Sequence, residues 1–306
     1  MRTEQIAYLD SVIRLGSFRA AARHLGVSQP TLTEQVRRLE EELDVTLLTR
    51  QHSGVSLTTA GEHLLPHIQR LLQDSRSLHE EAHALSNLQS GSVRIGGTPT
   101  LNYAFLVSSI LEYRRMYPNV RFEAIEAGSR RLIESVLSGD LDIAVVTAVE
   151  DLTSNKHLIA RPLFSDEVVI CLPATHRLAG ASGARLRDLK DDPWVVFGWD
   201  FMLRQLLEEL ALDTQLNVVY NASGSASTVR MVAMGIGITL TTMLAIKTAS
   251  VADRERVVSL PLLGKKVPAV HSYLIRRRGL WPTPASRELE RLVMRDREER
   301  QADGMQ

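Results

Sequence analysis

Polar side chains with long reach line one face of a predicted helix near the start of the chain. They are Gln29, Thr33, Glu34, Arg37 and Arg38. Amide, hydroxyl, carboxylate and guanidinium groups are the groups that read base edges and phosphates in the major groove of duplex DNA. The opposite face of the same helix carries leucine and valine at the spacing of one helical stripe, so that face is expected to pack on a core. The pattern therefore predicts base reading from an exposed helix face.

The elements that must hold this helix can be read from its flanks. Residues 3–15 and 18–25 have the apolar spacing of two further helices. Ser17 and Ser28 stand where capping residues are preferred, and Gly26 is suited to end the helix between them. A short helix, a tight turn and a reading helix form the arrangement of a helix-turn-helix. We therefore expect the helix that begins near residue 29 to enter the major groove.

Contacts with DNA are expected from the start of the reading helix and from a turn that follows it. The predicted DNA-binding residues are Ser28, Gln29, Pro30, Thr31, Thr33, Glu34, Arg37, Arg38, Arg50 and His52. Two of them have a competing interpretation. Glu34 either accepts a hydrogen bond from a cytosine amino group or pairs with Arg38 one helical turn away. His52 either reaches the DNA or is a solvated loop residue.

The charge balance does not by itself support a DNA-binding protein. The chain has 36 lysines and arginines against 36 aspartates and glutamates. Its first 60 residues also balance, because seven arginines stand against seven acids. DNA-binding domains usually carry a basic surface. Here a basic surface must come from where the arginines lie rather than from their number. The acids gather at residues 40–44, away from the start of the reading helix.

A long helix is predicted after the turn, and it starts with the capping-box spacing of Thr59 and Glu62. Its apolar or small residues alternate four and three apart, which is the seam of a coiled coil. They are Leu64, Ile68, Leu71, Ser75, Leu78, Ala82 and Leu85. The seam favours a contact between two chains over packing on the helix's own domain. Pro66 lies inside the helix and is expected to bend it slightly.

From residue 91 onwards the pattern changes to strands that alternate with helices, which is typical of a parallel α/β sheet. A second block of the same kind begins near residue 162. A returning strand over 271–278 and a last helix over 284–299 follow that block. The sequence therefore predicts two α/β blocks.

Together these pieces resemble a LysR-type transcriptional regulator. LTRQHSGVSLTTAGEHLLP is similar to the wing and linker helix of that family, and IGGTPTLNYAFL and LSGDLDIAVV are similar to its effector-binding domain. The resemblance implies a multi-domain α/β protein with a winged helix-turn-helix over 1–58 and a linker and dimerisation helix over 59–90. It implies one effector subdomain from 91–161 and 269–300 and a second from 162–268, in an architecture like that of periplasmic binding proteins.

The resemblance also implies how such a protein works. It would regulate transcription under the control of a small-molecule effector bound in the cleft of the C-terminal domain. The linker helix would form a homodimer, and two dimers would form a homotetramer. The partner would be double-stranded DNA with a dyad-symmetric operator, because two-fold protein symmetry is matched by the DNA site.

The predicted effector site follows from the position of strand ends, because ligands of open α/β sheets bind beyond the carboxyl ends of the strands. Hydroxyl-bearing and aromatic residues follow the predicted strands in both blocks. The predicted effector-binding residues are Thr98, Pro99, Thr100, Leu101, Ser129, Thr147, Phe197, Trp199, Phe201 and Ser225. Free N–H groups at the start of the first helix attract anions, so we expect an organic anion with a carboxylate. Each serine or threonine taken alone is also explained as a helix cap.

No set of residues that could carry catalysis stands out. The motifs G-x-S-x-G, G-K-[ST] and C-x-x-C are missing from the sequence. We therefore expect neither enzyme activity nor a cofactor besides the effector. The single cysteine, Cys171, lies in an apolar strand and is expected to be buried and unreactive. Redox sensing is the alternative, and it would need a partner thiol from another chain.

The predicted location is the cytoplasm. The first residues, MRTEQIAYLD, lack the apolar region of a signal peptide, and no apolar run approaches the roughly 18 residues of a membrane span. Two other classes stay open: an enzyme or solute-binding protein with an accessory N-terminal domain, and a DNA-binding protein without an effector. Gel shifts that show binding to the neighbouring intergenic DNA would exclude the enzyme or solute-binding protein. A ligand-induced shift in melting temperature would exclude the DNA-binding protein without an effector.

Overall fold

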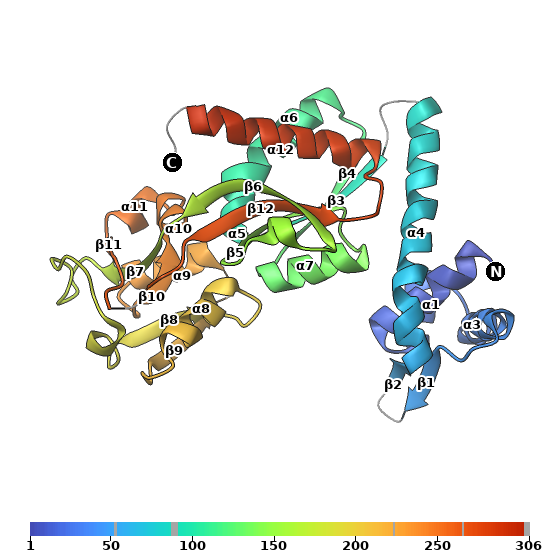
Figure 1. Cartoon of the computed structure of the whole chain (residues 1–306), viewed down its shortest axis with the longest axis horizontal. Coiled ribbons are helices and arrows are strands. Elements are labelled where there is room, and N and C mark those ends of the chain that lie inside the picture. Colours follow the sequence, from blue (N-terminus) through green and yellow to red (C-terminus); the bar gives the residue numbers. More distant parts are fainter. Residues whose placement is uncertain (52–53, 87–90, 223, 265, 303–306) are drawn as a thin grey trace. The chain divides into compact units, whose positions relative to one another are not determined.

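The computed structural model divides the chain into two units, Met1–Ser86 and Asn87–Gln306 (Figure 1). It describes residues 1–51, 54–86, 91–222, 224–264 and 266–302. The elements of the first unit are α1 (Thr3–Leu15), α2 (Phe18–Leu25), α3 (Gln29–Leu43), β1 (Leu48–Gln51), β2 (Gly54–Leu57) and α4 (Thr59–Ser86). Strands β1 and β2 form an antiparallel pair.

Local caps fix the ends of α2 and α3 where the sequence predicts them. The hydroxyl of Ser17 accepts a hydrogen bond from the N–H of Ala20, and that of Ser28 accepts one from Thr31. Gly26 follows α2 with a φ of 68°, a left-handed conformation that costs glycine little. These short-range interactions set the turn between the two helices.

One apolar cluster holds the first unit together. Helix α3 contributes Leu32, Val36 and Leu39, each at most 2% exposed, and they pack with residues of α1, α2 and α4. The prediction was wrong for Leu43, which is 38% exposed. The reason is that α3 ends there, and Asp44 turns the chain with a left-handed φ of 52°.

The start of α4 differs from the predicted capping box. The hydroxyl of Thr58, rather than that of Thr59, accepts a hydrogen bond from the N–H of Gly61 at 2.9 Å. The same hydroxyl donates to the carbonyl of Thr46 at 2.7 Å. Gly61 lies so close to the carbonyl oxygen of Leu47 that a Cβ would come within 2.2 Å of it. Only glycine allows the helix to pass this point.

The apolar stripe of α4 divides between two environments. Ile68 is 6% exposed and belongs to the core of the first unit. Leu71 and Leu78 are 44% and 69% exposed, and Ala82 is exposed as well. The side chain of Leu85 lies outside the described residues. The first part of the stripe therefore packs on its own domain, whereas Leu71 and Leu78 face outward.

A five-stranded sheet forms the centre of the second unit, in the strand order β4-β3-β5-β12-β6. Its strands are β3 (Gly91–Gly97), β4 (Val120–Glu126), β5 (Ile143–Ala148), β6 (Leu158–Asp166) and β12 (Val270–Arg277). Strand β3 is parallel to β4 and β5, whereas β12 is antiparallel to both β5 and β6. Strand β6 therefore runs in the same direction as β3, β4 and β5.

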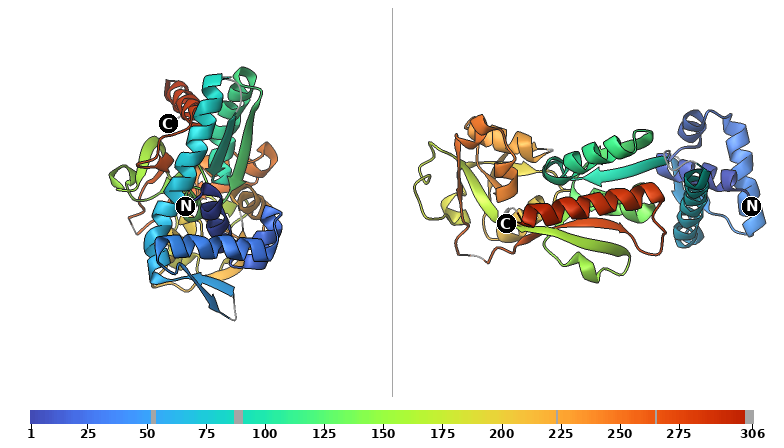
Figure 2. Two further views of the ribbon diagram at one scale, coloured as in Figure 1. Left: turned by 90° about the vertical axis from the view of Figure 1, so that its right-hand side faces the viewer. Right: turned by 90° about the horizontal axis from the view of Figure 1, so that it is seen from above.

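Helices cover both faces of this sheet (Figure 1, Figure 2). They are α5 (Pro99–Leu101), the π-helical η1 (Asn102–Leu106), α6 (Val107–Met116), α7 (Ser129–Ser138) and α12 (Pro284–Ala302). Successive residues of β5 face opposite sides of the sheet. Ile143 and Val145 pack on the side of α6 and α12, and Ala144 and Val146 pack on the side of α7. A continuous apolar strand is what a sheet covered on both faces requires.

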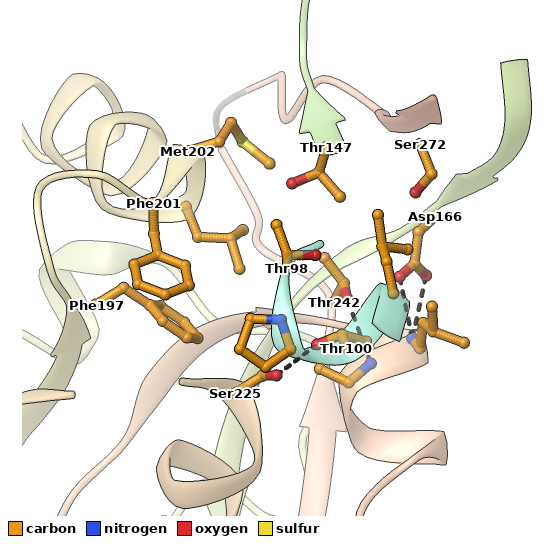
Figure 3. Close-up of a pocket in the computed structure, with 15 residues that line it drawn as sticks. Thr98, Thr100, Thr147, Asp166, Phe197, Phe201, Met202, Ser225, Thr242 and Ser272 are labelled. Atoms are coloured by element: carbon orange, nitrogen blue, oxygen red, sulfur yellow. Dashed lines mark hydrogen bonds between the residues drawn. The ribbon is translucent and has the colours of Figure 1, made fainter. Parts of the chain in front are cut away.

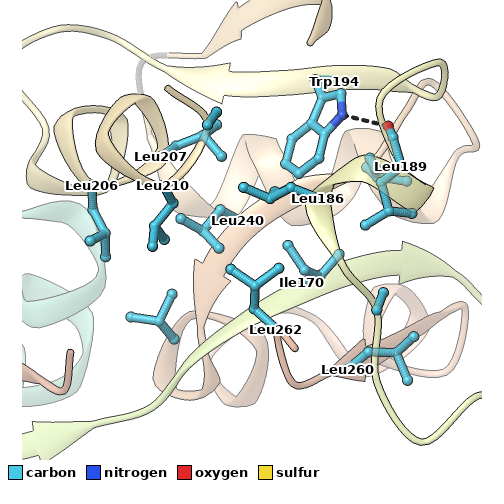
Figure 4. Close-up of a cluster of buried hydrophobic side chains, with 14 of the residues drawn as sticks. Ile170, Leu186, Leu189, Trp194, Leu206, Leu207, Leu210, Leu240, Leu260 and Leu262 are labelled. Atoms are coloured by element: carbon cyan, nitrogen blue, oxygen red, sulfur yellow. Dashed lines mark hydrogen bonds between the residues drawn. The ribbon is translucent and has the colours of Figure 1, made fainter. Parts of the chain in front are cut away.

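Strands β6 and β12 connect this sheet to a second set of elements. These are β7 (Val168–Pro173), β8 (Pro193–Phe197), α8 (Met202–Leu210), β9 (Asn217–Ala222), α9 (Ser225–Ala233), β10 (Thr239–Thr242), α10 (Met243–Lys247), α11 (Val251–Arg254) and β11 (Val257–Leu260). The strands form one sheet, β10-β7-β11, and a parallel pair, β8-β9. Trp194 is fully buried in their core and donates its indole N–H to the carbonyl of Leu189 at 3.0 Å (Figure 4).

Two features of the second unit differ from the prediction. The helix predicted after the first strand of the second unit contains the π-helical turn Asn102–Leu106. The short elements β11, α10 and α11 were not predicted, because four or five residues are too few to show a period. Within the described residues, no helix is both long and apolar enough to cross a membrane.

Candidate functional site

The start of α3 presents an exposed polar surface. Ser28, Gln29, Pro30 and Thr31 are exposed, and Thr33 is half-buried. The Ser28 hydroxyl caps the helix through the N–H of Thr31 at 3.2 Å. Gln29 is the first residue of the helix, the position from which reading helices contact base edges. The predicted groove-entering residues thus lie together on one accessible surface.

Glu34 forms ion pairs with both arginines of the reading helix, Arg37 and Arg38. Its carboxylate accepts hydrogen bonds from Arg37 at 2.9 Å and from Arg38 at 2.8 Å, and Arg37 also pairs with Glu41. The hydrogen bonds from Arg37 and Arg38 lower the pKa of Glu34 to about 2, so its charge persists at neutral pH. The predicted pair between Glu34 and Arg38 is confirmed. The participation of Arg37 in this pair was not predicted.

The predicted contacts from the turn after α3 can be placed only in part. Arg50 lies on β1, and its side chain is outside the described part of the chain. His52 lies outside the described residues. Strand β1 is attached to the reading helix, because the carboxylate of Glu40 accepts hydrogen bonds from the N–H groups of Leu47 at 2.7 Å and Leu48 at 3.1 Å. Glu40, one of the acids near the end of α3, therefore holds β1 against the helix.

A small cavity lies in the second unit, at the edge where β3, β5 and β6 end (Figure 3). Its volume is about 40 Å³. Eight of the ten predicted effector-binding residues line it: Thr98, Pro99, Thr100, Leu101, Thr147, Phe197, Phe201 and Ser225. The structure thus brings residues from both halves of the second unit to one place.

Neighbouring strands each place one polar side chain on this cavity. Thr98 follows β3, Thr147 belongs to β5, Ser272 to β12, and Asp166 ends β6. The strands β3, β5, β12 and β6 are consecutive in the sheet, and Ser272 is the direct cross-strand neighbour of Thr147. We call Thr98, Thr147, Ser272 and Asp166 the polar wall.

Two hydroxyls of the polar wall have no hydrogen-bond partner within the described part of the chain. Thr98 is 7% exposed and Ser272 is 1% exposed, and both hydroxyl oxygens are buried. Thr98 precedes α5, but its side chain makes no capping hydrogen bond, so the alternative of a helix cap is wrong here. A buried hydroxyl without a partner costs about 1–3 kcal/mol. A ligand that bonds these hydroxyls would remove that cost.

Asp166 was not predicted as a site residue, although it is the carboxylate of the polar wall. It is 9% exposed and accepts hydrogen bonds from the N–H groups of Glu167 at 2.9 Å and Leu244 at 3.1 Å. Burial raises the pKa of Asp166, and hydrogen bonds from Thr242 and the two N–H groups oppose that shift. Asp166 stands at the carboxyl end of a strand parallel to β5, and that position was the signal in the sequence.

The opposite side of the cavity is apolar. The rings of Phe197 and Phe201 lie with their centroids 5.4 Å apart, and Met202 lies beside them (Figure 3). The hydroxyls of Thr100 and Ser225 are hydrogen-bonded to each other, which connects α5 to α9 across the cavity. The cavity is therefore bordered by one polar wall, one apolar side and a hydroxyl bridge.

Ser129 and Trp199, both predicted effector contacts, do not line this cavity. The Ser129 hydroxyl accepts a hydrogen bond from the N–H of Thr147 at 3.0 Å, and Ser129 borders a larger, more open cavity between α7 and α8. Trp199 is 59% exposed, and the guanidinium of Arg204 lies 4.3 Å from its ring centroid. Trp199 therefore contacts Arg204 and does not line the cavity, and its contact with a ligand stays a prediction.

Cys171 lies in β7 and is completely buried. Burial raises the pKa of its thiol to about 12, which disfavours the thiolate that redox chemistry requires. This environment agrees with the predicted unreactive thiol. In the part of the chain that the structure describes, no three histidine, cysteine, aspartate or glutamate side chains gather in a way that could hold a metal ion.

Comparison with known proteins places these features in a family. Residues 3–62 match the bacterial regulatory helix-turn-helix of the lysR family, and residues 86–297 match the LysR substrate binding domain. An uncharacterised HTH-type transcriptional regulator of Bacillus subtilis, YwbI, is 32% identical over 94% of each chain. The HTH-type transcriptional regulator AlsR of Bacillus subtilis is 31% identical over 78% of this chain and 80% of its own.

Solved structures show the same fold. A full-length variant of OxyR from Pseudomonas aeruginosa has a TM-score of 0.68 at 24% identity, and covers 97% of this chain and 98% of its own. The effector binding domain of QuiR in complex with shikimate has a TM-score of 0.56 at 18% identity, over 69% of this chain and 98% of its own. The predicted fold class is confirmed. The chain belongs to the LysR family of transcriptional regulators, with an N-terminal DNA-binding domain and a C-terminal effector-binding domain.

The Glu34 cluster generates a prediction about binding to DNA of random sequence. Glu34→Gln should release Arg38, and should free Arg37 from one of its two carboxylate partners, so that both can pair with phosphates. Affinity for a random duplex should then rise, and the slope of log affinity against log salt should steepen by about one to two, since each phosphate contact contributes about 0.9. Fluorescence anisotropy across a salt series measures both quantities.

The matched control is Glu42→Gln, which makes the same change of charge near the other end of α3. It should change the salt slope less than Glu34→Gln does. Equal slopes for the two variants would mean that pairing with Glu34 does not keep the arginines of α3 from binding phosphates.

Proposed function

We propose that this regulator reads a dyad-symmetric operator through the start of α3 and responds to a small organic acid in the cavity at the sheet edge. The supporting observation is that one chain combines an exposed helix surface at the start of α3 with a cavity whose wall carries two hydroxyls that have no partner among the described residues. On this proposal the protein acts on DNA in the cytoplasm. It has no enzyme activity and needs no cofactor besides its effector.

The reading helix is tested by Gln29→Ala. Gln29 can form two hydrogen bonds to an adenine edge, so its loss should weaken binding to the specific site by about 1–3 kcal/mol and relax the sequence preference there. Gel shifts with the neighbouring intergenic DNA and with a random duplex measure both effects. The control is Gln215→Ala, an exposed glutamine of the second unit. Unchanged specific binding by Gln29→Ala would show that α3 does not enter the groove as proposed.

Assembly is proposed through α4. Leu71 and Leu78 are seven residues apart, which places them on one stripe of the helix, and both are largely exposed in the single chain. Large exposed leucines on a long helix are typical of a helix that packs against another helix. A homodimer through this stripe, and a homotetramer from two dimers, would present two reading helices about one DNA turn apart.

Leu78→Asp tests this interface. A charge on the stripe should dissociate the dimer and lower the apparent affinity for the operator by about tenfold or more, because the second half-site then no longer binds as part of the same molecule. Light scattering and gel shifts give the two readouts. Leu212→Asp, which alters a leucine that is 82% exposed in the second unit, serves as the control. If the assembly of Leu78→Asp has the same mass in light scattering as that of the wild-type protein, α4 is not the main interface.

An organic acid is proposed as effector because hydrogen-bond donors converge on the cavity. The N–H groups of Thr100 and Leu101 belong to a first helical turn and have no acceptor within the helix. The Thr98 hydroxyl adds a donor, and shikimate, the ligand in the QuiR complex, is an organic acid. A ligand that binds one relative arrangement of the two halves better than another would shift their population, and with it the assembly on DNA.

A further inference from the structure

The polar wall has an electrostatic property that restricts the ligand. Among the described residues that line the cavity, Asp166 is the one charged side chain. A plain carboxylate would bring a second negative charge next to a buried one, and two like charges repel strongly in a site with little water. A ligand that donates a hydrogen bond to Asp166 avoids this repulsion.

Asp166 has room for such a donor. A carboxylate offers about four acceptor positions. The N–H groups of Glu167 and Leu244 and the hydroxyl of Thr242 use about three of them. Asp166 itself lines the cavity, so a group on the ligand can reach the remaining position.

Ser272 stands beside Asp166 on the same face of the crossing strands. It pairs with Phe164 of β6, two residues before Asp166, and successive residues of a strand alternate between its faces. Ser272 and Asp166 are thus diagonal neighbours across the strand pair. The Ser272 hydroxyl is 1% exposed and has no hydrogen-bond partner within the described residues. One ligand group can therefore contact both side chains.

The size of the cavity limits the distance between the ligand's polar groups. The cavity is small, at about 40 Å³. A donor that reaches Asp166 and an acid group that reaches Thr98 must then be close together in the ligand. An apolar remainder would have to extend towards Phe197 and Phe201.

We infer that the effector is a small carboxylic acid that carries a hydroxyl or ammonium group close to its carboxylate. The hydroxyl or ammonium group binds Asp166 and Ser272. The carboxylate binds the hydroxyl of Thr98 and the backbone N–H groups at the start of α5. This inference rests on the proposed function and narrows it, because plain acids of the same size are rejected by Asp166.

Matched ligands test the inference directly. The full-length protein is titrated with three triplets: acetate, glycolate and glycine; propionate, lactate and alanine; and phenylpropionate, phenyllactate and phenylalanine. Within each triplet only the group next to the carboxylate changes from hydrogen to hydroxyl to ammonium. In at least one triplet, the hydroxy or amino member should raise the melting temperature and bind about tenfold or more tightly than its plain acid. The member that responds identifies the donor group.

Two variants connect the response to the polar wall. Asp166→Asn should abolish the discrimination between the responding ligand and its plain acid. Ser272→Ala removes a hydroxyl that has no partner, so it should keep or raise the melting temperature of the free protein and weaken binding of the responding ligand. Ser109→Ala is the matched control, since Ser109 is 2% exposed and its hydroxyl donates to the carbonyl of Phe105. That variant should lower the melting temperature and leave ligand binding unchanged.

Three results would overturn the inference: plain acids that bind as well as their substituted forms, a panel without any response, or wild-type affinity in Ser272→Ala. Ser272→Ala decides the matter if Asp166→Asn does not fold. The proposed regulator would survive each of these results as long as the protein binds intergenic DNA in a manner that depends on Gln29. Loss of that DNA binding would count against the proposed function instead.

Discussion

Strands β6 and β12 pair over their whole length, and the architecture of the second unit depends on that pairing. Eight residue pairs join them, from Asp166 opposite Val270 to Leu158 opposite Arg277. The two strands are also the chain connections between the halves, so the link between the halves borders the cavity. Asp166 lies on this strand pair, as does the Ser272 hydroxyl beside it. A ligand that contacts them acts on the connection itself, which is how a cavity of small volume can influence the arrangement of two large halves.

The DNA-binding unit has no excess of positive charge with which to attract DNA. Electrostatic attraction to phosphates is independent of sequence, and a strongly basic surface would bind most of the genome. Glu34 pairs with Arg37 and Arg38 on α3. On the proposed function, this pairing weakens the attraction to phosphates, and discrimination between sequences rests on direct readout by polar side chains such as Gln29.

Much of this arrangement was predictable from the sequence because it depends on local patterns. The caps at Ser17 and Ser28 and the stripe of α3 as far as Leu39 were predicted correctly, and the strand-end rule placed Thr98 and Thr147 on the cavity. Side-chain orientation was not predictable, since the contact of Trp199 with Arg204 involves packing that no spacing reveals. Asp166 ends a crossing strand, so the same rule could have found it, but its position beside Ser272 depends on the order of the strands in the sheet.

On the proposed function, occupancy of the cavity changes how the protein binds DNA. DNase I footprinting of the full-length protein on the neighbouring intergenic DNA tests it most directly, with and without the ligand that raises the melting temperature most. We expect protection on both sides of a dyad, with a pattern whose length or hypersensitive positions change when the ligand is added. An identical footprint at a ligand concentration that saturates the cavity would contradict the account.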